Sequence, residues 1–184
     1  ELSLIGVRST RGETRFYPLV ENVHRNGILH TSRAPAPDSS ALQPKAEALL
    51  SALLEDLGYV GALTLELFEQ GGQLLANEIA PRVHNSGHWT IEGAETSQFE
   101  NHVRAVLGLP LGSTATRGHA GMLNLVGVLP DIGAFLRLHG VHPHLYGKAP
   151  RPGRKLGHVT VHADSPSGRD GSLATCEAML LLKG

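Results

Sequence analysis

Two apolar runs joined by a glycine turn constrain this chain more than any other feature. The runs "YVGALTLELFE" (59–69) and "GQLLANEIA" (72–80) meet at the turn "QGG" (70–72). Apolar runs of this length around a short glycine turn predict an antiparallel β-hairpin. Side chains alternate between the two faces of a strand, so Glu66 faces away from the leucines on either side of it. The hairpin therefore places Glu66 and Glu78 on neighbouring strands, where both can face one cleft.

Two carboxylates in largely apolar strands need an explanation. An ionised carboxylate inside a strand is costly unless it is paired or binds a metal ion. Mg²⁺ takes one or two carboxylates and completes its shell with water and phosphate oxygens. Glu66 and Glu78 are therefore candidate Mg²⁺ ligands. The alternative, which spacing alone leaves open, is a pair of solvated carboxylates on an exposed face of the sheet.

The hairpin leads into the polar segment "NEIAPRVHNSGHWT" (77–90). Arg82 lies four residues after Glu78, and a guanidinium can bind a carboxylate or a phosphate through two hydrogen bonds. A surface ion pair with Glu78 is the simpler alternative for this arginine. The segment is therefore a candidate anion-binding loop beside the candidate metal ligands.

His84 and His88 are four residues apart, a spacing that suggests zinc when it occurs on a helix. Pro81 and Gly87 argue against a helix here, and no third ligand stands at a suitable spacing. We therefore expect loop histidines that line a polar pocket. The eleven histidines of the chain form no other ligand pattern.

The segment "YGKAPRPGRKLGH" (146–158) carries four cations within eight residues, broken up by prolines and a glycine. Such a loop can hold a phosphate group, and a solvated basic turn is the alternative. The segment is too short and too poor in aromatic residues to indicate nucleic acid binding. The four cations are Lys148, Arg151, Arg154 and Lys155.

The remaining patterns predict an α+β fold. Three strands near 1–9, 14–24 and 27–35 form an antiparallel meander. A helix over 38–58 has a capping box of Ser40 with Gln43 and an apolar stripe of Leu42, Ala46, Leu49, Leu53 and Leu57. The other expected elements are a helix over 96–108, a strand over 120–128, a short helix near 132–140, strands near 142–148 and 155–163, and a final helix from about 171. The loop at 110–118 marks a boundary between domains 1–109 and 110–184.

Composition excludes several classes of protein. The formal net charge of −1 gives no reason to expect nucleic acid or an anionic membrane as a partner. The single cysteine, Cys176, lies in an apolar run and is expected to be a buried thiol, with a reactive thiol as the alternative. No run approaches the roughly 20 apolar residues of a membrane span, and no signal peptide is present. These features indicate a soluble cytoplasmic protein, and the missing initiator methionine suggests part of a longer chain.

Several segments together resemble one enzyme family. "YVGALTLELF", "LANEIAPRVHNSGHWTIEGAETSQFENHVRAVLGLPL" and "LYGKAPRPGRKLGH" are similar to 5-(carboxyamino)imidazole ribonucleotide synthase, an ATP-grasp ligase of bacterial purine biosynthesis. "ELSLI", "FYPLVENVHRNGIL" and "GMLNLVG" also match in order. The resemblance runs almost end to end but covers only the later half of the enzyme. It implies the C-terminal half of an ATP-grasp domain followed by a small C-terminal α+β domain that is itself truncated.

The resemblance implies a carboxylation that consumes ATP. In this family ATP phosphorylates bicarbonate to carboxyphosphate, which, directly or through released CO₂, carboxylates the exocyclic amine of 5-aminoimidazole ribonucleotide. The implied cofactors are ATP and one or two Mg²⁺ ions, and the family is usually a homodimer. The family's phosphate loop and two ATP-contacting lysines should precede Glu1, so we expect the isolated chain to be inactive.

The resemblance also assigns roles to individual residues. Glu66 and Glu78 correspond to the metal ligands, with Glu78 also contacting ATP, and Arg82 to the group that orients bicarbonate and stabilises carboxyphosphate. Many ATP-grasp enzymes have a metal-binding asparagine two residues after the second glutamate, where this chain has Ala80. The implied nucleotide contacts are Glu1, His24 and Asn77. His84, Asn85 and Ser86 would line the same substrate pocket as Arg82, and the implied contacts with the ribonucleotide phosphate are Lys148, Arg151, Arg154 and Lys155.

Two other functions stay open beside this resemblance. Another ATP-grasp carboxylase, such as a biotin carboxylase, shares the bicarbonate chemistry but lacks the basic loop for a ribonucleotide phosphate. A non-catalytic domain that keeps the fold for assembly has no use for the like charges of Glu66 and Glu78. The residues that precede Glu1 in the full protein distinguish the scaffold from an enzyme.

Overall fold

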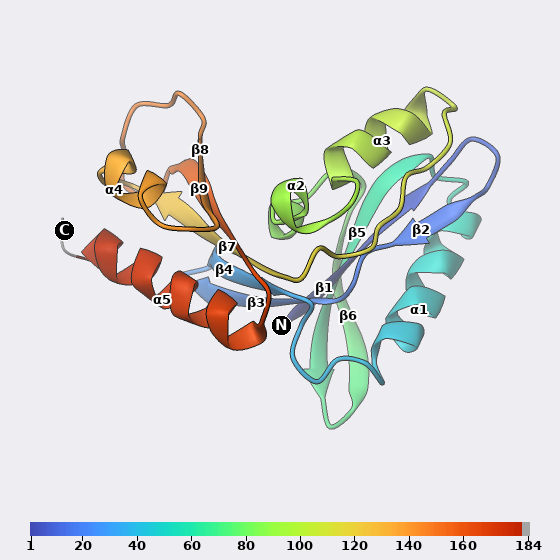
Figure 1. Cartoon of the computed structure of the whole chain (residues 1–184). Coiled ribbons are helices and arrows are strands. Elements are labelled where there is room, and N and C mark those ends of the chain that lie inside the picture. Colours follow the sequence, from blue (N-terminus) through green and yellow to red (C-terminus); the bar gives the residue numbers. More distant parts are fainter. Residues whose placement is uncertain (182–184) are drawn as a thin grey trace.

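The computed structural model describes residues 1–181, and its two arms form a V (Figure 1). The strands are β1 (Leu2–Arg8), β2 (Thr14–Phe16), β3 (Val20–Arg25), β4 (Ile28–Ala34), β5 (Gly61–Gln70), β6 (Gln73–Ala80), β7 (His119–Val126), β8 (Val141–Leu145) and β9 (Lys155–Ala163). The helices are α1 (Gln43–Asp56), the 3₁₀ turn η1 (Asn85–Gly87), α2 (Thr90–Gly93), α3 (Gln98–Val106), α4 (Ile132–Leu136) and α5 (Pro166–Leu181). Helices and antiparallel strands together make an α+β fold, as predicted.

One antiparallel sheet runs through both arms of the V (Figure 1). Its strand order is β6-β5-β1-β3-β4-β7-β9-β8, with β2 paired to β1 alone. The pairing of β4 with β7 carries the sheet across the loop at 110–118. The domain boundary near residue 109 therefore stays a prediction, because strands from both sides of it share hydrogen bonds.

Alternating side chains give the right arm of the V a core on each face of the sheet. Leu4 of β1 packs with Leu50 of α1, whereas Ile5 of the same strand packs in the cluster that includes Ala105 of α3. A third cluster fills the left arm between the sheet and helices α4 and α5. It contains Cys176, which is fully buried as predicted, and burial raises the pKa of its thiol to about 11.

Several sequence-based expectations need correction. The predicted strand over 14–24 is two strands, because Pro18 has no N–H to donate between them. The predicted capping box of α1 is absent: Leu42 occupies the N-cap position without a side-chain hydrogen bond. Gln43 instead accepts a hydrogen bond from the Leu19 N–H and donates one to the Tyr17 carbonyl.

The buried stripe of α1 also differs from the prediction. Its buried residues are Ala46, Leu50 and Leu54, whereas Leu49 and Leu57 are largely exposed. The periodicity identified the helix, but leucines on both sides left its orientation undetermined.

The last helix begins earlier than predicted. Pro166, which can occupy a first helical position because its missing N–H needs no partner there, starts α5 about five residues before the expected point. The Ser165 hydroxyl accepts a hydrogen bond from the Gly168 N–H and caps this end. The expected continuation to the end of the chain falls partly on residues 182–184, outside the described residues.

A β-bulge shapes the predicted hairpin. Gly71 and Gly72 both have positive φ, which suits the two-residue turn between β5 and β6. Leu67 pairs with Ala76, but the next pair along is Glu66 with Glu78, so Asn77 is an extra residue on β6. The bulge therefore sets Glu78 directly opposite Glu66.

Candidate active site

Glu66 is the centre of a group of acidic residues at the end of the hairpin. Residues directly opposite each other in an antiparallel pair have their Cβ atoms roughly 5 Å apart, which applies to Glu66 and Glu78. Burial raises the pKa of Glu66, and the nearby charges of Glu1 and Glu78 raise it further. Glu66 is only partly exposed, whereas Glu78 is exposed. The register sets Glu78 opposite Glu66 as the hairpin predicts, and their joint role as metal ligands stays a prediction. The solvated alternative describes Glu78 but not Glu66.

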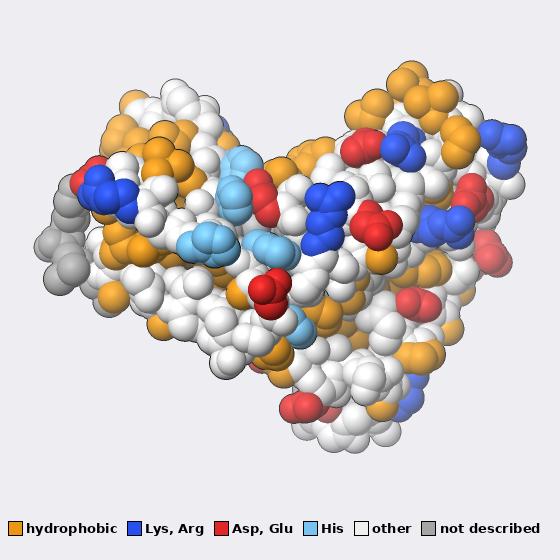
Figure 2. All heavy atoms as spheres, viewed as in Figure 1, with side chains coloured by type: hydrophobic (Ala, Val, Ile, Leu, Met, Phe, Trp, Pro, Cys, Tyr) orange, Lys and Arg blue, Asp and Glu red, His pale blue; other side chains and the backbone are white. Residues whose placement is uncertain are grey.

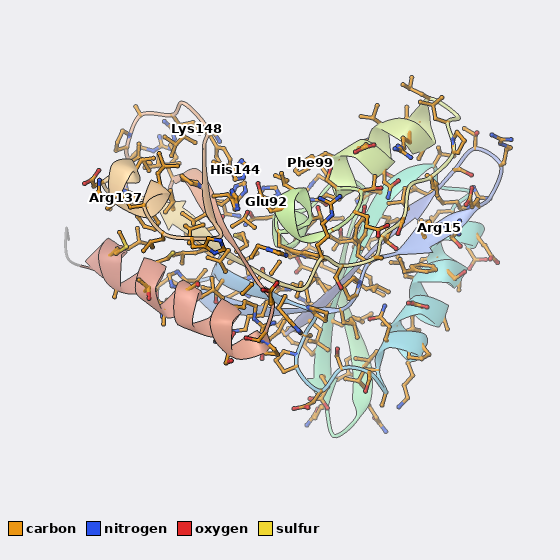
Figure 3. All side chains as sticks on the ribbon, in the orientation of Figure 1. Arg15, Glu92, Phe99, Arg137, His144 and Lys148 are labelled. Atoms are coloured by element: carbon orange, nitrogen blue, oxygen red, sulfur yellow. The ribbon has the colours of Figure 1, made fainter. Side chains whose placement is uncertain are left out.

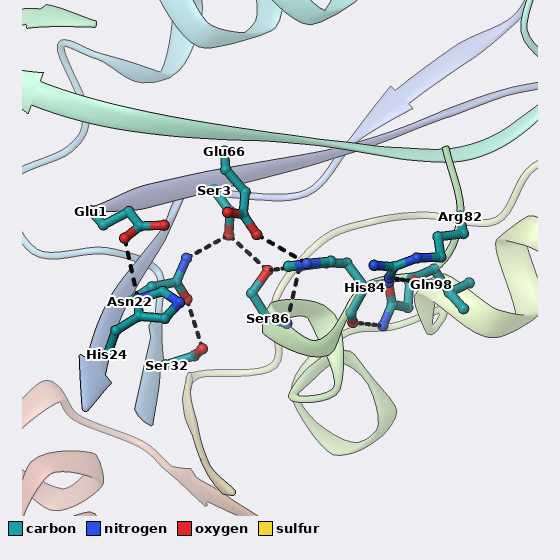
Figure 4. Close-up of polar contacts among 11 residues, drawn as sticks. Glu1, Ser3, Asn22, His24, Ser32, Glu66, Arg82, His84, Ser86 and Gln98 are labelled. Atoms are coloured by element: carbon teal, nitrogen blue, oxygen red, sulfur yellow. Dashed lines mark hydrogen bonds and ion pairs between the residues drawn. The ribbon is translucent and has the colours of Figure 1, made fainter. Parts of the chain in front are cut away.

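Two histidines contact these acids (Figure 4). The Glu66 Oε1 atom lies 3.0 Å from His84 Nε2, and the Glu1 Oε2 atom lies 3.2 Å from His24 Nδ1. Burial and the positive charge of Arg82 lower the pKa of His84 to about 4, so its ring is neutral at pH 7. The contact with Glu66 is therefore a hydrogen bond from a neutral ring rather than an ion pair.

Close packing fixes the loop that carries His84. The Gln98 side chain of α3 bonds both the backbone N–H and the backbone C=O of His84, at 2.9 Å and 2.7 Å. A Cβ atom at Gly87 would lie 2.2 Å from the Ile5 side chain and 2.6 Å from Gln98 Oε1. Only glycine therefore fits at position 87, and the 3₁₀ turn brings the loop back against the sheet.

A pocket of about 240 Å³ brings predicted residues from both halves of the chain together. Asn85 turns its side chain into a buried position where, among residues 1–181, its Nδ2 atom has no hydrogen-bond partner. Ser86 is fully buried and lies beneath the pocket rather than in its wall. The residues that line the pocket are His24, Gly27, Ile28, Leu29, Glu66, His84, Asn85 and Lys155.

Lys155 is the cation that reaches this pocket from the C-terminal half. It is the first residue of β9 and is half buried. Burial and the neighbouring charge of Arg82 lower the pKa of Lys155, whereas Glu66 opposes that shift. Arg82 itself is exposed beyond the end of β6 and donates to the Val83 carbonyl at 3.0 Å. The structure thus brings Arg82 and Lys155 close enough for their charges to act on each other and on Glu66.

The other predicted cations lie on the basic loop, residues 147–154 between β8 and β9. Lys148 and Arg151 are exposed, and the Lys148 ammonium lies 5.3 Å from the centre of the Tyr146 ring. Arg154 is partly exposed, and its guanidinium donates to the Ala149 carbonyl at 3.4 Å. Three cations of the predicted phosphate site are therefore loosely held.

The donor set fits a Mg²⁺ ion better than zinc. Among residues 1–181, no three His, Cys, Asp or Glu side chains are arranged to hold a metal ion. Mg²⁺ needs only one or two carboxylates when water and phosphate supply the remaining ligands. Burial, and after it the charges of Glu1 and Glu78, raise the pKa of Glu66, and a bound cation would neutralise this negative charge. Glu66 and Glu78 are therefore the residues that could hold Mg²⁺.

A cluster of histidines lies in the hollow between the arms, and no spacing in the sequence indicates it (Figure 2). The His158 ring stacks on His144 with centroids 4.5 Å apart and lies 4.6 Å from His88. The His144 Nε2 atom contacts Glu92 Oε1 at 2.9 Å, which joins the two arms (Figure 3). The rings lie against one another instead of converging on a point, so they form packing contacts across the hollow. Only the pairing of β8 with β9 brings His144 opposite His158.

A second cavity, of about 1000 Å³, lies away from these residues. It is bounded by β2, the start of α1 and the segment 111–116. None of the predicted site residues lines this cavity. The smaller, more polar pocket is therefore the candidate site, although its volume is lower.

Known protein families match both halves of the chain. Residues 1–99 match the ATP-grasp domain. The chain belongs to the ATP-grasp family. Residues 120–169 of this ATP-grasp protein match the phosphoribosylaminoimidazole carboxylase C-terminal domain. No helix among residues 1–181 is long and apolar enough to cross a membrane.

Curated relatives share one description, N5-carboxyaminoimidazole ribonucleotide synthase. The protein from Pseudomonas aeruginosa is 52% identical over 180 residues, which cover 98% of this chain and 49% of the relative. The protein from Escherichia coli is 47% identical over 183 residues, covering 99% of this chain and 50% of the relative. The chain thus spans about half the length of these relatives, and the predicted resemblance is confirmed.

Solved structures agree with the fold. The N5-carboxyaminoimidazole ribonucleotide synthetase of Thermus thermophilus superposes with a TM-score of 0.95 at 58% identity, covering 97% of this chain and 50% of that one. The synthase of Aspergillus clavatus, solved with ADP and 5-aminoimidazole ribonucleotide, gives a TM-score of 0.86 at 36% identity, covering 93% and 48%. The expected fold, part of an ATP-grasp domain followed by a small C-terminal region, is confirmed.

Proposed function

We propose that this chain supplies the metal- and substrate-binding half of an enzyme that carboxylates 5-aminoimidazole ribonucleotide. In the reaction, ATP phosphorylates bicarbonate, and the resulting carboxyphosphate or its CO₂ reacts with the exocyclic amine of the ribonucleotide. The products are 5-(carboxyamino)imidazole ribonucleotide, ADP and phosphate, a step of purine biosynthesis. The proposal gains support from relatives that match along almost all of this chain.

One observation carries the proposal. Lys155, from the C-terminal half, lines the same small pocket as Glu66 and His84 of the ATP-grasp half. Phosphoryl transfer needs positioning and neutralisation of charge more than covalent help from the protein. A pocket with acidic residues on one side and a lysine on the other can hold a cation and an anionic substrate next to each other.

The acidic side of the pocket would bind ATP, through Mg²⁺, and bicarbonate. Glu66 and Glu78 would hold one or two Mg²⁺ ions, which neutralise charge on the phosphates when bound. Glu1, His24 and Asn77 would contact the nucleotide. Arg82, beside the carboxylates and open to solvent, would orient bicarbonate and stabilise the charge that develops on carboxyphosphate.

The basic side would serve the ribonucleotide. Lys155 lies nearest to the acidic residues, and the exposed cations of the basic loop can close on a phosphate group. His84 and Asn85 line the pocket, and the free donor of Asn85 suits an acceptor on a substrate. The full set proposed for the phosphate is Lys148, Arg151, Arg154 and Lys155.

The test uses a chimera in which this chain replaces the matching half of the Pseudomonas aeruginosa relative. We expect ADP formation that requires both bicarbonate and 5-aminoimidazole ribonucleotide. The matched control carries Glu66→Gln and Glu78→Gln and should form little ADP. ADP formation that needs bicarbonate and biotin instead would favour a biotin carboxylase. No ADP formation from a folded chimera that binds no nucleotide would favour a scaffold.

Assembly and location are further parts of the proposal. We propose a homodimer in the cytoplasm, with small molecules as the only ligands and neither nucleic acid nor membrane as a partner. Sedimentation of the chimera at several concentrations tests the dimer. A single monomeric species at all concentrations would contradict it.

A further inference from the structure

We propose that Ser86 and Gln98, beneath the pocket, position the ring of His84. The ring then carries its hydrogen on Nε2 and donates a hydrogen bond to Glu66. His84 is then a fixed hydrogen-bond donor and not a proton acceptor for a substrate. The inference rests on contacts within this chain and holds whether or not the proposed carboxylation is correct.

Gln98 fixes the backbone of His84. A backbone N–H can only donate and a backbone C=O can only accept, so the two ends of the Gln98 amide are determined: Oε1 faces the N–H and Nε2 faces the C=O. Gln98 is fully buried, and its own N–H bonds the Thr90 hydroxyl at 3.0 Å. The position of His84 therefore follows from the packing of α3.

Ser86 selects the tautomer of the ring. Its backbone N–H points to His84 Nδ1 at 3.4 Å, and its hydroxyl lies 2.9 Å from the same atom. The N–H can only donate, so Nδ1 acts as an acceptor and carries no hydrogen. The hydrogen of a neutral ring is then on Nε2, 3.0 Å from the Glu66 oxygen that accepts it.

A buried chain of side chains sets the direction of the Ser86 hydroxyl (Figure 4). The Ser32 hydroxyl donates to Asn22 Oδ1 at 2.7 Å, and Asn22 Nδ2 donates to the Ser3 hydroxyl at 2.9 Å. Ser3 uses its single hydrogen on the Ser86 oxygen, at 2.8 Å. The hydrogen of Ser86 is therefore left for His84 Nδ1.

The members of this chain come from three strands of the sheet. Ser3 lies on β1, Asn22 on β3 and Ser32 on β4, and each is at most 5% exposed. Buried polar groups that are fully paired have few alternative arrangements, because each change leaves a group unpaired. The sheet thus transmits one hydrogen-bond direction to the loop at the pocket.

The consequence concerns Glu66. The hydrogen bond from His84 fixes Oε1 of Glu66 and so orients the carboxylate that would hold a cation, as partners of metal-binding carboxylates commonly do. With Nδ1 bonded to Ser86 and Nε2 carrying a hydrogen, His84 has no free lone pair to take a proton. A general base for the reaction must therefore be another group.

The first experiment is nuclear magnetic resonance of this chain labelled with ¹⁵N-histidine at neutral pH. The signals of His84 are identified by their loss in His84→Gln. We expect the ¹⁵N shifts of His84 to show a protonated Nε2 and an unprotonated Nδ1. The reverse pattern, or a ring protonated on both nitrogens, would overturn the proposal.

The second experiment asks whether Ser86 sets the tautomer. Ser86→Ala removes the hydroxyl donor and should lower the ratio of the two His84 tautomers about fivefold, as loss of a neutral hydrogen bond does. Ser51→Ala is the matched control, because its exposed hydroxyl bonds only Glu55 on α1. It should leave the His84 signals in place.

A structural role alone would not move this ratio. An unchanged ratio in folded Ser86→Ala would contradict the proposal. If Ser86→Ala does not fold, Ser3→Ala replaces it, because it frees Ser86 to accept a hydrogen from His84. A shift toward protonated Nδ1 in that variant supports the proposal, and an unchanged spectrum overturns it.

Discussion

The carboxylate side of the pocket and the basic loop differ in how their charged groups are held. On the carboxylate side (Glu1, Glu66 and His84), the side chains are partly buried and contact one another or the loop beneath them. On the basic loop, Lys148 and Arg151 extend into solvent with few contacts. The first arrangement suits groups that act on charge developing in a reaction, which need fixed geometry. The second suits capture of a flexible substrate, because the cations can adjust to it.

The largest expected effect comes from Arg82→Ala in the chimera. Arg82 lies beside the fixed carboxylates, so its loss should lower kcat roughly a hundredfold or more. Steady-state kinetics with varied bicarbonate measures this. A change confined to KM for the ribonucleotide would show that Arg82 binds that substrate as the basic loop is proposed to do. It would contradict the proposed difference between the two regions.

A glycine pair tests how rigid the carboxylate side is. Gly87→Ala should destabilise the chain by about 2 kcal/mol, because the added Cβ meets Ile5 and Gln98. Gly171→Ala, in α5 with open space around it, should be stabilising by up to about 1 kcal/mol. Urea unfolding of both variants gives the comparison. Equal stability of the two would show that the loop can relax.

The basic loop should respond differently to the loss of a charge. Arg154→Ala should raise KM for the ribonucleotide about tenfold and leave KM for ATP nearly unchanged, since one charged hydrogen bond is lost far from the chemistry. Arg137→Ala, an exposed arginine after α4, is the control. A rise in KM for ATP alone would show that the loop binds ATP and not the ribonucleotide.

The smallest effect concerns the histidine cluster in the hollow between the two arms. Burial lowers the pKa of His158 from 6.5 to about 3. Between those values the unfolded chain binds a proton that the folded chain does not, so stability falls as pH drops below about 6.5. His158→Gln should reduce that slope by about 1 kcal/mol per pH unit, measured by urea unfolding from pH 7 to pH 5. Exposed His139→Gln should leave the slope unchanged.

Much of the fold was predictable from local patterns. The hairpin, α1 and α3 follow from short apolar repeats with glycine at their ends, and the carboxylates of Glu66 and Glu78 follow from the alternation of a strand. The side of α1 that packs against the sheet was not predictable, because the helix carries leucines on more than one side. The break at Pro18 is readable from its missing N–H, whereas the prediction gives a single strand over 14–24.

The site was predictable only in part. Family resemblance named Glu1 and His24, and the structure pairs them. The stack of His88, His144 and His158 depends on which strands are neighbours, which no local spacing reveals. The role of Gln98 was also out of reach, since a glutamine at the start of a helix gives no signal that it clamps a loop fourteen residues earlier.

The bulge at Asn77 has a consequence for self-association. β6 is the outermost strand of this sheet, with Leu75 and Ile79 both exposed, which is the kind of edge on which a second chain can add a strand. Asn77 divides that edge into four residues on the hairpin side and three on the other. An incoming strand would meet a change of register halfway along, so neither segment offers a long template for aggregation.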